Sequence, residues 1–302
     1  MCRCTDLFIC RLNIIRINSP FVKGGSGDSA NVNIKRMSMD LNGKIVWITG
    51  ASSGIGEALA YTAAKEGAKL ILSARREEEL KRVATNCKID SQNYLVLPID
   101  LEHTENIEEK VNLVIQKFGS IDVLINSSGM GHRTKVVNTP MAIDRRVMEV
   151  NFFGTINLTK SVARLMQKQK SGKLVVITSI MGKYGLPLYA TYSASKHALF
   201  GFFESLRQEL YNDNVSVLIA TPGFINTDVS TKLLKEDGTP YGIKSAAQEK
   251  GMSATDCAKG IVKAIKNDRD HKYIGKYEIF SVHVKQFFPK MFFKLMRRMT
   301  KE

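Results

Sequence analysis

Short apolar runs alternate with longer amphipathic segments along most of this chain of 302 residues. Apolar runs of this kind are typical of parallel strands buried on both faces, and the helix-length segments between them predict βαβ units. No internal repeat or boundary signal divides the pattern, and the length fits one domain. The sequence therefore predicts an α/β fold with a doubly wound parallel sheet of about seven strands and helices on both faces. The expected strands lie at 44–49, 69–74, 93–98, 121–126, 174–178, 215–221 and 273–275.

A glycine-rich turn follows the first apolar run. The segment 50–56 (GASSGIG) stands between that run and the helix-forming stretch 57–60. A strand, a glycine turn and a helix are the context that a phosphate-binding loop requires. The glycines permit a tight turn, and the start of the helix offers free N–H groups to a pyrophosphate. An ordinary glycine-rich turn has the same composition, so both interpretations are open at this point.

A tyrosine and a lysine stand one helical turn apart, at Tyr192 and Lys196 in the run TYSASK. At this spacing both side chains can face one site. A tyrosine hydroxyl has a pKa near ~10 in water. We expect the ammonium of Lys196 to stabilise the phenolate and lower the pKa of Tyr192, which allows proton exchange with an alcohol or ketone oxygen. The same spacing also occurs by chance on surface helices, so its context decides.

The ordered motifs resemble the short-chain dehydrogenase/reductase family. Residues 49–56 show the family's Thr-Gly-x-x-x-Gly-x-Gly pattern and not the Gly-x-Gly-x-x-Gly spacing of other dinucleotide-binding proteins. Ser179 ends an apolar run thirteen residues before Tyr192, and Asn151 stands in the run VNFFG. The segment 222–227 (PGFINT) resembles the family's Pro-Gly segment. The resemblance covers roughly residues 41–275 and implies a single Rossmann domain that binds a nicotinamide cofactor.

The resemblance implies a catalytic set of Asn151, Ser179, Tyr192 and Lys196. Tyr192 gives a proton to the substrate oxygen as hydride arrives, or takes one in the reverse direction, and Ser179 holds that oxygen by a hydrogen bond. Lys196 lowers the pKa of Tyr192 and binds the nicotinamide ribose, while Asn151 positions a water that links Lys196 to solvent. Taken singly, Asn151 is equally a helix residue bonded to backbone, and Ser179 a cap at the end of a strand.

The end of the second expected strand bears on the choice between NAD and NADP. An NAD enzyme typically ends this strand with an acid that binds the ribose hydroxyls. Here Arg75 and Arg76 precede the first acid, Glu77. Because a 2′-phosphate suits a guanidinium fork, we predict NADP(H) as cofactor. We expect Arg75 to be the better contact, with Ser52 adding a hydroxyl, and interpret Arg76 as a solvated residue of the following helix.

The remaining cofactor contacts follow from the family's motifs. Asp100 matches the acid that contacts the adenine amino group, and Leu101 is expected to line the adenine pocket. The chain departs from the family at 126–129, where NSSG replaces the usual Asn-Asn-Ala-Gly. Both replacements are small, so we expect the turn to survive with altered hydrogen bonds. The predicted cofactor-binding residues are Gly50, Ser52, Ser53, Gly54, Ile55, Gly56, Arg75, Asp100, Leu101, Asn126, Gly129, Tyr192, Lys196, Pro222, Gly223 and Thr227.

The segment 226–251 is irregular and punctuated by glycine. In the family this region forms a mobile lid over the substrate, and a long loop of this composition fits that role. We interpret His132 as an exposed loop residue and not as a catalytic base. The candidate substrate contacts are mostly apolar, so we expect a hydrophobic carbonyl compound. They are Met130, Ile180, Met181, Tyr184, Leu186 and Tyr189, with His132 beside them.

Positive charge concentrates at the two ends of the chain. The net charge is +15, and residues 1–38 carry six basic and two acidic side chains, while residues 283–302 carry six and one. More than half of the excess therefore lies outside the expected nucleotide-binding core. Because the core also contains no recognition motif for nucleic acid, a nucleic-acid function is excluded.

Residues 276–302 are predicted to form a basic amphipathic tail, which is a candidate for lying on an anionic membrane. The alternative is that its apolar stripe packs on the protein's own core or on a partner subunit. Similar tails occur in hydroxysteroid-dehydrogenase-like members of the family, several of them membrane-associated, which favours a lipid or steroid substrate. The stripe comprises Phe288, Met291, Phe292, Leu295, Met296 and Met299, with Lys290, Lys294, Arg297, Arg298 and Lys301 opposite.

Residues 1–40 are predicted to be a disordered or leader tail. Arginines interrupt its apolar stretch, which is too short for a transmembrane helix or a convincing secretory signal. A mitochondrial transit peptide and translation from Met37 or Met39 both remain open. The five cysteines form no disulfide framework and no complete metal-ligand set, so we expect no metal and a reducing intracellular compartment, either cytoplasmic or peripheral to a membrane.

The sequence as a whole predicts an NADP-dependent oxidoreductase that acts on the CH–OH group of a hydrophobic, lipid- or steroid-like alcohol or on the matching ketone. A 3-oxoacyl-thioester reductase is the alternative within the enzyme class. A non-catalytic NADP-binding sensor is the alternative outside it, although a sensor has no need of all four catalytic residues. The resemblance also implies a homodimer or homotetramer.

Overall fold

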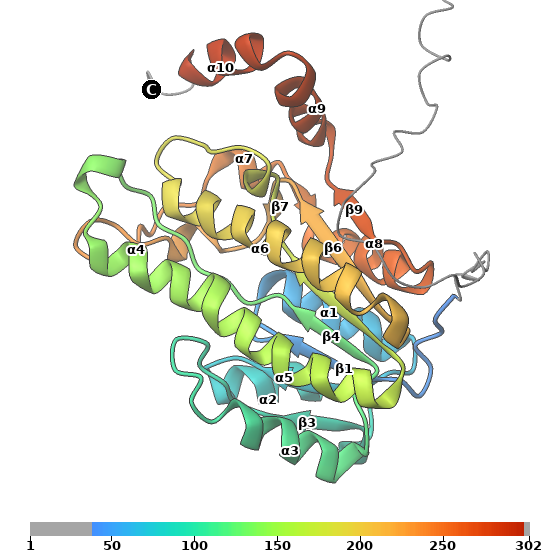
Figure 1. Ribbon diagram of the computed structural model, residues 1–302. Helices are drawn as coiled ribbons and strands as arrows, with labels where there is room; N and C mark the ends of the chain where they lie inside the picture. Colours follow the sequence, from blue (N-terminus) through green and yellow to red (C-terminus); the bar gives the residue numbers. More distant parts are fainter. Residues whose placement is uncertain (1–37, 299–302) are drawn as a thin grey trace, which may run out of the picture. The chain divides into compact units, whose positions relative to one another are not determined.

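The computed structural model describes residues 38–298, and its centre is a parallel sheet of seven strands (Figure 1). The strand order is β3-β2-β1-β4-β5-β6-β9. The order reverses between β1 and β4, and in such sheets the ligand crevice lies outside the carboxyl ends of the strands at that point. The strands are β1 (Ile45–Thr49), β2 (Lys69–Ser73), β3 (Tyr94–Val96), β4 (Val123–Asn126), β5 (Gly172–Ile177), β6 (Val215–Pro222) and β9 (His271–Ile274).

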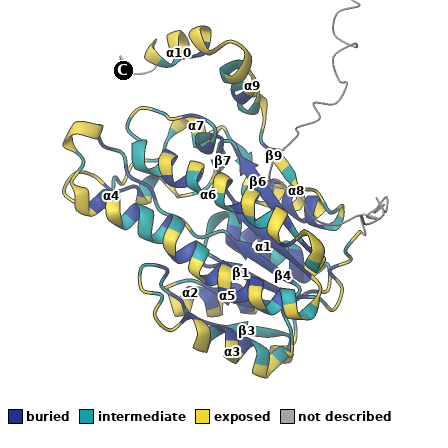
Figure 2. Ribbon diagram, viewed as in Figure 1, coloured by how far each residue is buried: buried dark blue, intermediate teal, exposed yellow. Residues whose placement is uncertain are grey.

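Helices cover both faces of this sheet, so the predicted doubly wound α/β Rossmann fold is confirmed. Helices α1 (Gly54–Lys65), α2 (Glu77–Asn86) and α8 (Ala254–Lys266) pack on one face. Helices α3 (Ile107–Phe118), α5 (Gly154–Gln169) and α6 (Ala190–Glu209) pack on the other. Figure 2 shows the buried strands between these two layers.

The strands are apolar throughout because successive side chains enter opposite hydrophobic cores. In β1, Val46 and Ile48 belong to the core under α1 and α8. Their neighbours Ile45 and Trp47 belong to the core under α5 and α6. Trp47 is fully buried, and its indole N–H donates to the hydroxyl of Ser73 on β2 at 2.9 Å.

A second, two-stranded sheet joins β7 (Ile225–Asn226) to β8 (Met252–Ser253) and brackets the predicted lid. The lid contains a short 3₁₀ helix (Ser230–Lys232) and α7 (Ala246–Glu249). An isolated bridge from Leu234 to His132 attaches the lid to the loop after β4, and a second bridge joins Leu234 to Pro240 within the lid. This placement over the carboxyl ends of the strands agrees with a lid, and its motion remains a prediction.

The chain continues beyond β9 into α9 (Phe280–Phe287) and α10 (Pro289–Arg298). Phe292 is buried against the ring of Tyr184, with the ring centroids 4.8 Å apart. Phe288 on the same predicted stripe is 61% exposed, and most of α10 faces outward (Figure 2). One residue of the predicted apolar stripe, Phe292, therefore packs on the protein's own core, while Phe288 is on the surface. Met299 and Lys301 lie outside the described residues, as does nearly all of the predicted leader tail.

Within residues 38–298, no helix has both the length and the apolar character needed to cross a membrane.

The pH dependence of stability is expected to contain a contribution from His271. Burial, followed by the positive charges of Lys183 and Arg207, lowers its pKa from 6.5 to about 4. Its Nε2 lies 2.8 Å from the Thr221 hydroxyl. Because the folded state resists protonation, the free energy of unfolding is largest above pH 6.5 and falls by up to about 3 kcal/mol as the pH decreases towards 4.

Urea unfolding of the wild type and of His271→Gln between pH 7 and pH 4 measures this contribution. The variant is expected to show the shallower pH dependence, since glutamine does not titrate. Equal slopes for the two proteins over this range would show that the imidazole carries no such penalty.

Candidate active site

The glycine turn after β1 is built for close backbone approach. Gly50 adopts φ +66°, and a side chain there would lie 2.9 Å from the backbone of Ser127. A Cβ on Gly56 would lie 2.2 Å from the carbonyl oxygen of Gly50. The backbone of the turn thus packs against the start of α1 and against the residues that follow β4. Only glycine fits at these two positions.

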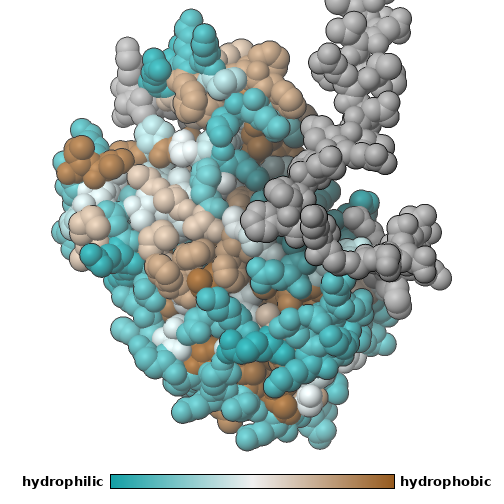
Figure 3. Space-filling model, in the orientation of Figure 1, coloured by the Kyte–Doolittle hydropathy of each residue, from teal (hydrophilic) through white to brown (hydrophobic). Residues whose placement is uncertain are grey.

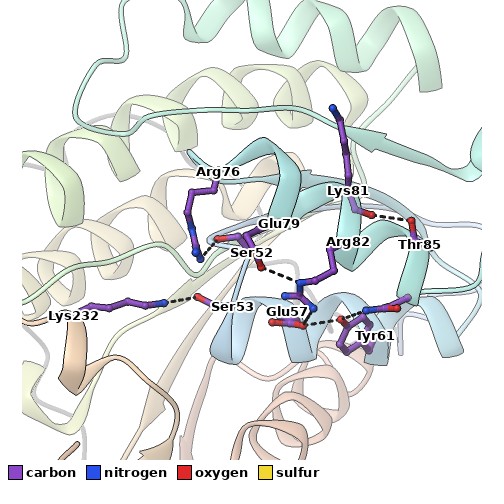
Figure 4. Close-up of polar contacts among 11 residues, drawn as sticks. Ser52, Ser53, Glu57, Tyr61, Arg76, Glu79, Lys81, Arg82, Thr85 and Lys232 are labelled. Carbon is purple, nitrogen blue, oxygen red and sulfur yellow. Dashed lines mark hydrogen bonds and ion pairs between the residues drawn. The ribbon is translucent and has the colours of Figure 1, made fainter. Parts of the chain in front are cut away.

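The start of α1 fits a phosphate group. Ser53, the N-cap residue, makes no side-chain cap hydrogen bond in the described structure. The guanidinium of Arg76 lies 3.5 Å from the hydroxyl of Ser52, and the ammonium of Lys232 lies 3.4 Å from the hydroxyl of Ser53 (Figure 4). Two cations from different segments therefore meet the N-terminus of a helix, which is itself attractive to anions.

Arg75 and Arg76 are both exposed, and the contacts favour Arg76 as the phosphate ligand, while the choice between them remains a prediction. Arg76, interpreted from its position as a solvated residue of the following helix, is the arginine whose side chain reaches the glycine turn at Ser52 (Figure 4). Arg76 is also the N-cap residue of α2, so its side chain starts from the extended backbone between β2 and that helix. Lys232 was not among the predicted site residues, because the sequence gives no sign that the lid approaches the turn.

The NSSG departure keeps the turn after β4 intact. Thr49 accepts hydrogen bonds from the backbone N–H groups of Ser127 and Ser128, at 3.1 and 3.2 Å. Asn126 is buried and donates to the Thr159 hydroxyl on α5 at 3.0 Å. Among the described residues, its side-chain oxygen has no hydrogen-bond partner. Asn126 thus fixes the end of β4 and leaves one buried acceptor free.

Asp100 and Leu101 follow β3 at the same edge of the sheet. The Asp100 carboxylate accepts from the backbone N–H of Glu102 at 3.0 Å, so it also shapes the local turn. Leu101 is buried, and its carbonyl lies 2.0 Å from where a Cβ on Gly154 would stand. The pair therefore sits against the start of α5. Their contact with adenine remains a prediction.

Asn151 lies in a π-helical turn (Glu149–Phe153) between α4 (Met141–Met148) and α5. A π-turn widens the helix locally and is frequent at functional sites. The buried amide of Asn151 accepts from the backbone N–H of Met130 and donates to its carbonyl, both at 2.8 Å, and donates to the Ser195 hydroxyl at 2.9 Å. It therefore locks the loop after β4 to the first turns of α6.

Lys196 is buried beside that amide. Its ammonium donates to the carbonyl of Ile177, at the end of β5, at 3.0 Å. A Cβ on Gly129 would stand 3.5 Å from both this ammonium and the Asn151 side-chain oxygen, so the glycine leaves the space between them open. Burial lowers the pKa of Lys196 to about 8. The ammonium form therefore prevails at neutral pH and is lost readily above it.

Tyr192 faces Ser179 across the end of β5. Burial raises the pKa of Tyr192, and a hydrogen bond with Ser179 opposes part of that rise. The expectation that Lys196 lowers the pKa of Tyr192 was therefore wrong. The Lys196 ammonium lies 5.7 Å from the centre of the Tyr192 ring and is directed at Ile177. At neutral pH, Tyr192 is a protonated phenol that can donate to a substrate oxygen.

The Pro-Gly segment closes the site from β6. The backbone N–H of Gly223 donates to the carbonyl of Ile274 on β9 at 2.8 Å. The methyl group of Thr227 lies 3.3 Å from where a Cβ on Gly54 would stand. The segment therefore runs from Pro222 across to the glycine turn, between the predicted nicotinamide and pyrophosphate positions.

Comparisons with known proteins identify the family. The family model described as short chain dehydrogenase matches residues 44–238, more than half of the chain. The chain belongs to the short-chain dehydrogenase/reductase family.

Two curated relatives of this short-chain dehydrogenase/reductase match most of its length. The Dehydrogenase/reductase SDR family protein 7-like of Anopheles gambiae is 41% identical over 239 residues, which are 78% of this chain and 75% of the relative. The human Dehydrogenase/reductase SDR family member 7 is 36% identical over 274 residues, which are 89% of this chain and 81% of the relative.

Solved structures share the fold. A short chain dehydrogenase/reductase from Burkholderia phymatum in complex with NAD has a TM-score of 0.74, is 23% identical, and aligns over 84% of this chain and 96% of its own. A short chain dehydrogenase from Burkholderia cenocepacia in complex with NADP has a TM-score of 0.70, is 22% identical, and aligns over 85% and 99%. One holds NAD and the other NADP, so the fold leaves the cofactor open.

The predicted substrate residues of this short-chain dehydrogenase/reductase fall into three groups. Ile180, Tyr184 and Leu186 pack together with Phe292 of α10, so the C-terminal helices brace this loop. Met130 packs against Leu234 of the lid. The remaining two flank the active-site tyrosine: Met181 donates its backbone N–H to the Ser179 hydroxyl, and Tyr189 precedes α6.

His132 is fully buried and not exposed as predicted. Its Nε2 accepts the backbone N–H of Thr191 at 3.2 Å, so the neutral ring carries its proton on Nδ1, which lies 2.9 Å from the Thr134 hydroxyl. Burial lowers the pKa of His132, which favours this neutral form. His132 therefore positions the start of α6, directly before Tyr192, and is not a catalytic base.

Proposed function

We propose that this protein is an NADP-dependent oxidoreductase that reduces a hydrophobic ketone or aldehyde, or oxidises the matching alcohol. The observation that carries the proposal is the convergence of Tyr192, Ser179, Lys196 and Asn151 at the carboxyl ends of β4 and β5, next to a glycine turn that fits a phosphate. Family membership supports dehydrogenase or reductase chemistry in general.

Each of the four side chains has a role in that chemistry. When bound, NADPH supplies the hydride. Tyr192 donates its phenolic proton to the substrate oxygen, and Ser179 holds the same oxygen through its hydroxyl. Lys196 holds the nicotinamide ribose through its ammonium group. Asn151 keeps the Met130 loop in register with α6 and thereby maintains the space beside Lys196 for a proton-relaying water.

The preference for NADP rests on the charges around the turn. Arg76 at Ser52 is suited to a 2′-phosphate, because a guanidinium can donate two parallel hydrogen bonds to phosphate oxygens. Lys232 at Ser53 is suited to the pyrophosphate at the start of α1. Among the described residues, the acids nearest in sequence, Glu77 to Glu79, follow on α2, where Glu79 pairs with Arg82. Glu57, in the first turn of α1, is paired with Arg82 at 2.8 Å, so Arg76 is not taken up by that carboxylate.

Replacing Arg76 by Met is expected to weaken NADPH binding about 10- to 100-fold, the effect of losing charge-assisted hydrogen bonds to one phosphate. NADH binding is expected to change less than about threefold, since NADH has no 2′-phosphate. Fluorescence titration with both cofactors measures the two affinities. Arg75→Met is the matched control, and a larger loss of NADPH affinity in that variant would reinstate Arg75 as the phosphate contact.

Oxidation of NADPH against a panel of ketones and aldehydes, with NADH in parallel, tests the proposed activity. The panel should include hydrophobic and steroid-like ketones and 3-oxoacyl thioesters, because an acyl-thioester reductase is the second enzyme that this site could serve. Faster turnover of thioesters would establish that alternative. Tight NADPH binding without turnover of any compound would point to a sensor.

We further propose contact with a membrane through α10. Met291, Phe293 and Leu295 are exposed on α10, which also carries four basic residues, and Phe288 is exposed just before it. Figure 3 shows hydrophobic and hydrophilic surface side by side on this segment. This combination suits an anionic lipid surface, which would place the protein at the periphery of an intracellular membrane. Sedimentation with vesicles of anionic and of neutral lipid tests it, and equal, low binding to both would refute it.

A homodimer is the proposed assembly. In the family, the helices corresponding to α5 and α6 commonly form the interface, and Phe153 is about half exposed at the start of α5. Phe152, in the π-turn before α5, packs edge-on against Phe202 of α6, with ring centroids 6.2 Å apart. Sedimentation equilibrium measures the state, and a monomer at micromolar concentration would contradict the proposal.

A further inference from the structure

A cavity of about 180 Å³ lies between the lid and the loops that precede α6 and follow β4. Its polar wall contains Arg133, Tyr189, Tyr241 and Lys244, and its apolar wall includes Leu233 and Ile243. In the part of the chain that the structure describes, no acidic residue lines it. The cavity is therefore small, partly apolar and positively charged.

Arg133 is held in place for recognition. Its Nη1 donates to the Tyr189 hydroxyl at 3.1 Å, and its guanidinium lies 5.2 Å from the Tyr241 ring and 5.9 Å from the Tyr189 ring. Its backbone N–H donates to the carbonyl of Leu234 at 2.9 Å, which fixes the loop to the lid. Two aromatic rings thus limit the side chain's conformations while leaving other guanidinium N–H groups available.

Arg133 has no carboxylate partner among residues 38–298. The second cation of the cavity differs, because Lys244 lies 3.5 Å from the carboxylate of Asp228. A half-buried guanidinium that faces a cavity without an acid offers strong, directional binding to an anion. The net charge presented to a ligand therefore comes chiefly from Arg133.

The cavity lies one layer of packed residues away from Tyr192. A Cβ on Gly131 would lie 3.4 Å from the Tyr192 ring on one side and 2.8 Å from a methyl group of Leu233 on the other. Leu233 in turn lines the cavity, and Tyr189 stands one helical turn before Tyr192. Gly131 and Leu233 therefore stand between the Tyr192 ring and the cavity, and a substrate with its carbonyl at Tyr192 reaches Arg133 by displacing the Leu233 side chain of the lid.

We propose that this cavity binds a carboxylate at the far end of the substrate, so that the preferred substrates are ketones with an apolar chain that ends in an anionic group. The inference rests on the proposed reductase function and narrows its substrate class. Arg133 acts as the specificity-determining residue: it donates to the carboxylate, while Leu233 and Ile243 contact the chain. A purely neutral ketone leaves the guanidinium without its anion.

Oxo acids that carry a methyl ketone at one end and a carboxylate at the other test the proposal. Lengthening their chain varies the distance between the carbonyl group at Tyr192 and the carboxylate. The probes are 5-oxohexanoate, 7-oxooctanoate and 9-oxodecanoate, each beside its methyl ester, with NADPH and the full-length protein. At the best chain length, kcat/KM for the acid is expected to exceed that for the ester about 10- to 100-fold, the contribution of a charge-assisted hydrogen-bonded pair.

Three variants assign this difference to Arg133. Arg133→Met is expected to remove the preference for the acid while changing kcat/KM for the ester and the affinity for NADPH less than about threefold. Arg133→Lys keeps the charge and is expected to retain part of the preference. Arg145→Met, which removes an exposed cation from α4, is the control and is expected to behave as the wild type.

The outcomes separate this proposal from the proposed reductase function. Equal kcat/KM for acid and ester in the wild type at every length overturns the carboxylate site, as does an equal loss for both probes in Arg133→Met. If no probe is reduced, calorimetric titration of the oxo acids into the protein with and without NADP decides. Binding that Arg133→Met abolishes would uphold the site, absent binding would refute it, and the reductase function is judged separately on the full carbonyl panel.

Discussion

Replacing Tyr192 by Phe is expected to lower kcat/KM for carbonyl reduction about 10²- to 10⁴-fold, the range for loss of a positioned general acid. Only the hydroxyl is removed, so the ring's contact with the loop at Gly131 is retained. Because burial raises the pKa of this phenol, it is protonated at neutral pH and holds the proton that the substrate oxygen takes up. The oxidation of NADPH by the best carbonyl compound of the panel measures the loss.

Two measurements separate chemistry from damage to the fold. The Kd for NADPH and the Tm of Tyr192→Phe are expected to match those of the wild type. Tyr211→Phe, which removes an exposed hydroxyl, is the matched control and is expected to retain full activity. Activity of Tyr192→Phe within a factor of three of the wild type would remove Tyr192 from the reaction.

Gly56→Ala is expected to reduce NADPH affinity at least about 100-fold, because the glycine turn must open to admit the new methyl group. The added Cβ would lie 2.2 Å from the Gly50 carbonyl oxygen and 2.7 Å from its carbon. These are backbone atoms, which cannot turn aside as a side chain can. The opening displaces the N–H groups at the start of α1 from the position that suits a phosphate.

Gly201→Ala is the matched control for this substitution. Gly201 lies inside α6, and a Cβ there meets nothing within 4 Å. Alanine is expected to leave NADPH binding unchanged and to stabilise the helix by up to about 1 kcal/mol. Titration of NADPH together with urea unfolding measures both quantities. Unchanged NADPH affinity in Gly56→Ala would show that the turn does not hold the cofactor.

The fold could be predicted from the sequence because its strands are buried on both faces. Each of the seven expected apolar runs coincides with a strand of the sheet, although β3 is shorter than expected and β9 begins earlier. The local pattern of apolar residues is enough to predict a strand that is covered by helices on both faces of the sheet. The π-turn that holds Asn151 was not predicted, because a π-turn and an α-helix share the same hydrophobic periodicity.

The site could be predicted only as far as local motifs reach. The glycine turn and the Tyr192–Lys196 pair are short-range patterns, and the structure brings them to one edge of the sheet. Arg76 and Lys232 approach the turn through contacts between residues 24 and 179 positions apart. The Arg133 side chain is positioned by the rings of Tyr189 and Tyr241, which belong to two other segments of the chain. Such tertiary contacts leave no local signal.

Solvation explains the other differences. The exposure assigned to His132 was wrong because its loop is covered by Leu234 and by the start of α6. The lowered pKa of Tyr192 was wrong because the spacing gives the nearness of an ammonium and not the depth of burial. In both cases the sequence identified the chemical group, and the surrounding protein determined its environment.

Transfer of deuterium from NADPH dideuterated at C4 of the nicotinamide tests the central proposal most directly. Mass spectrometry of the alcohol formed from the best carbonyl compound of the panel reads the result. The account predicts one deuterium on the carbinol carbon with the wild type, and none above background with Tyr192→Phe over the same time. Tight NADPH binding with no labelled alcohol from any carbonyl compound would contradict the account, and would leave a protein that binds the cofactor without using it.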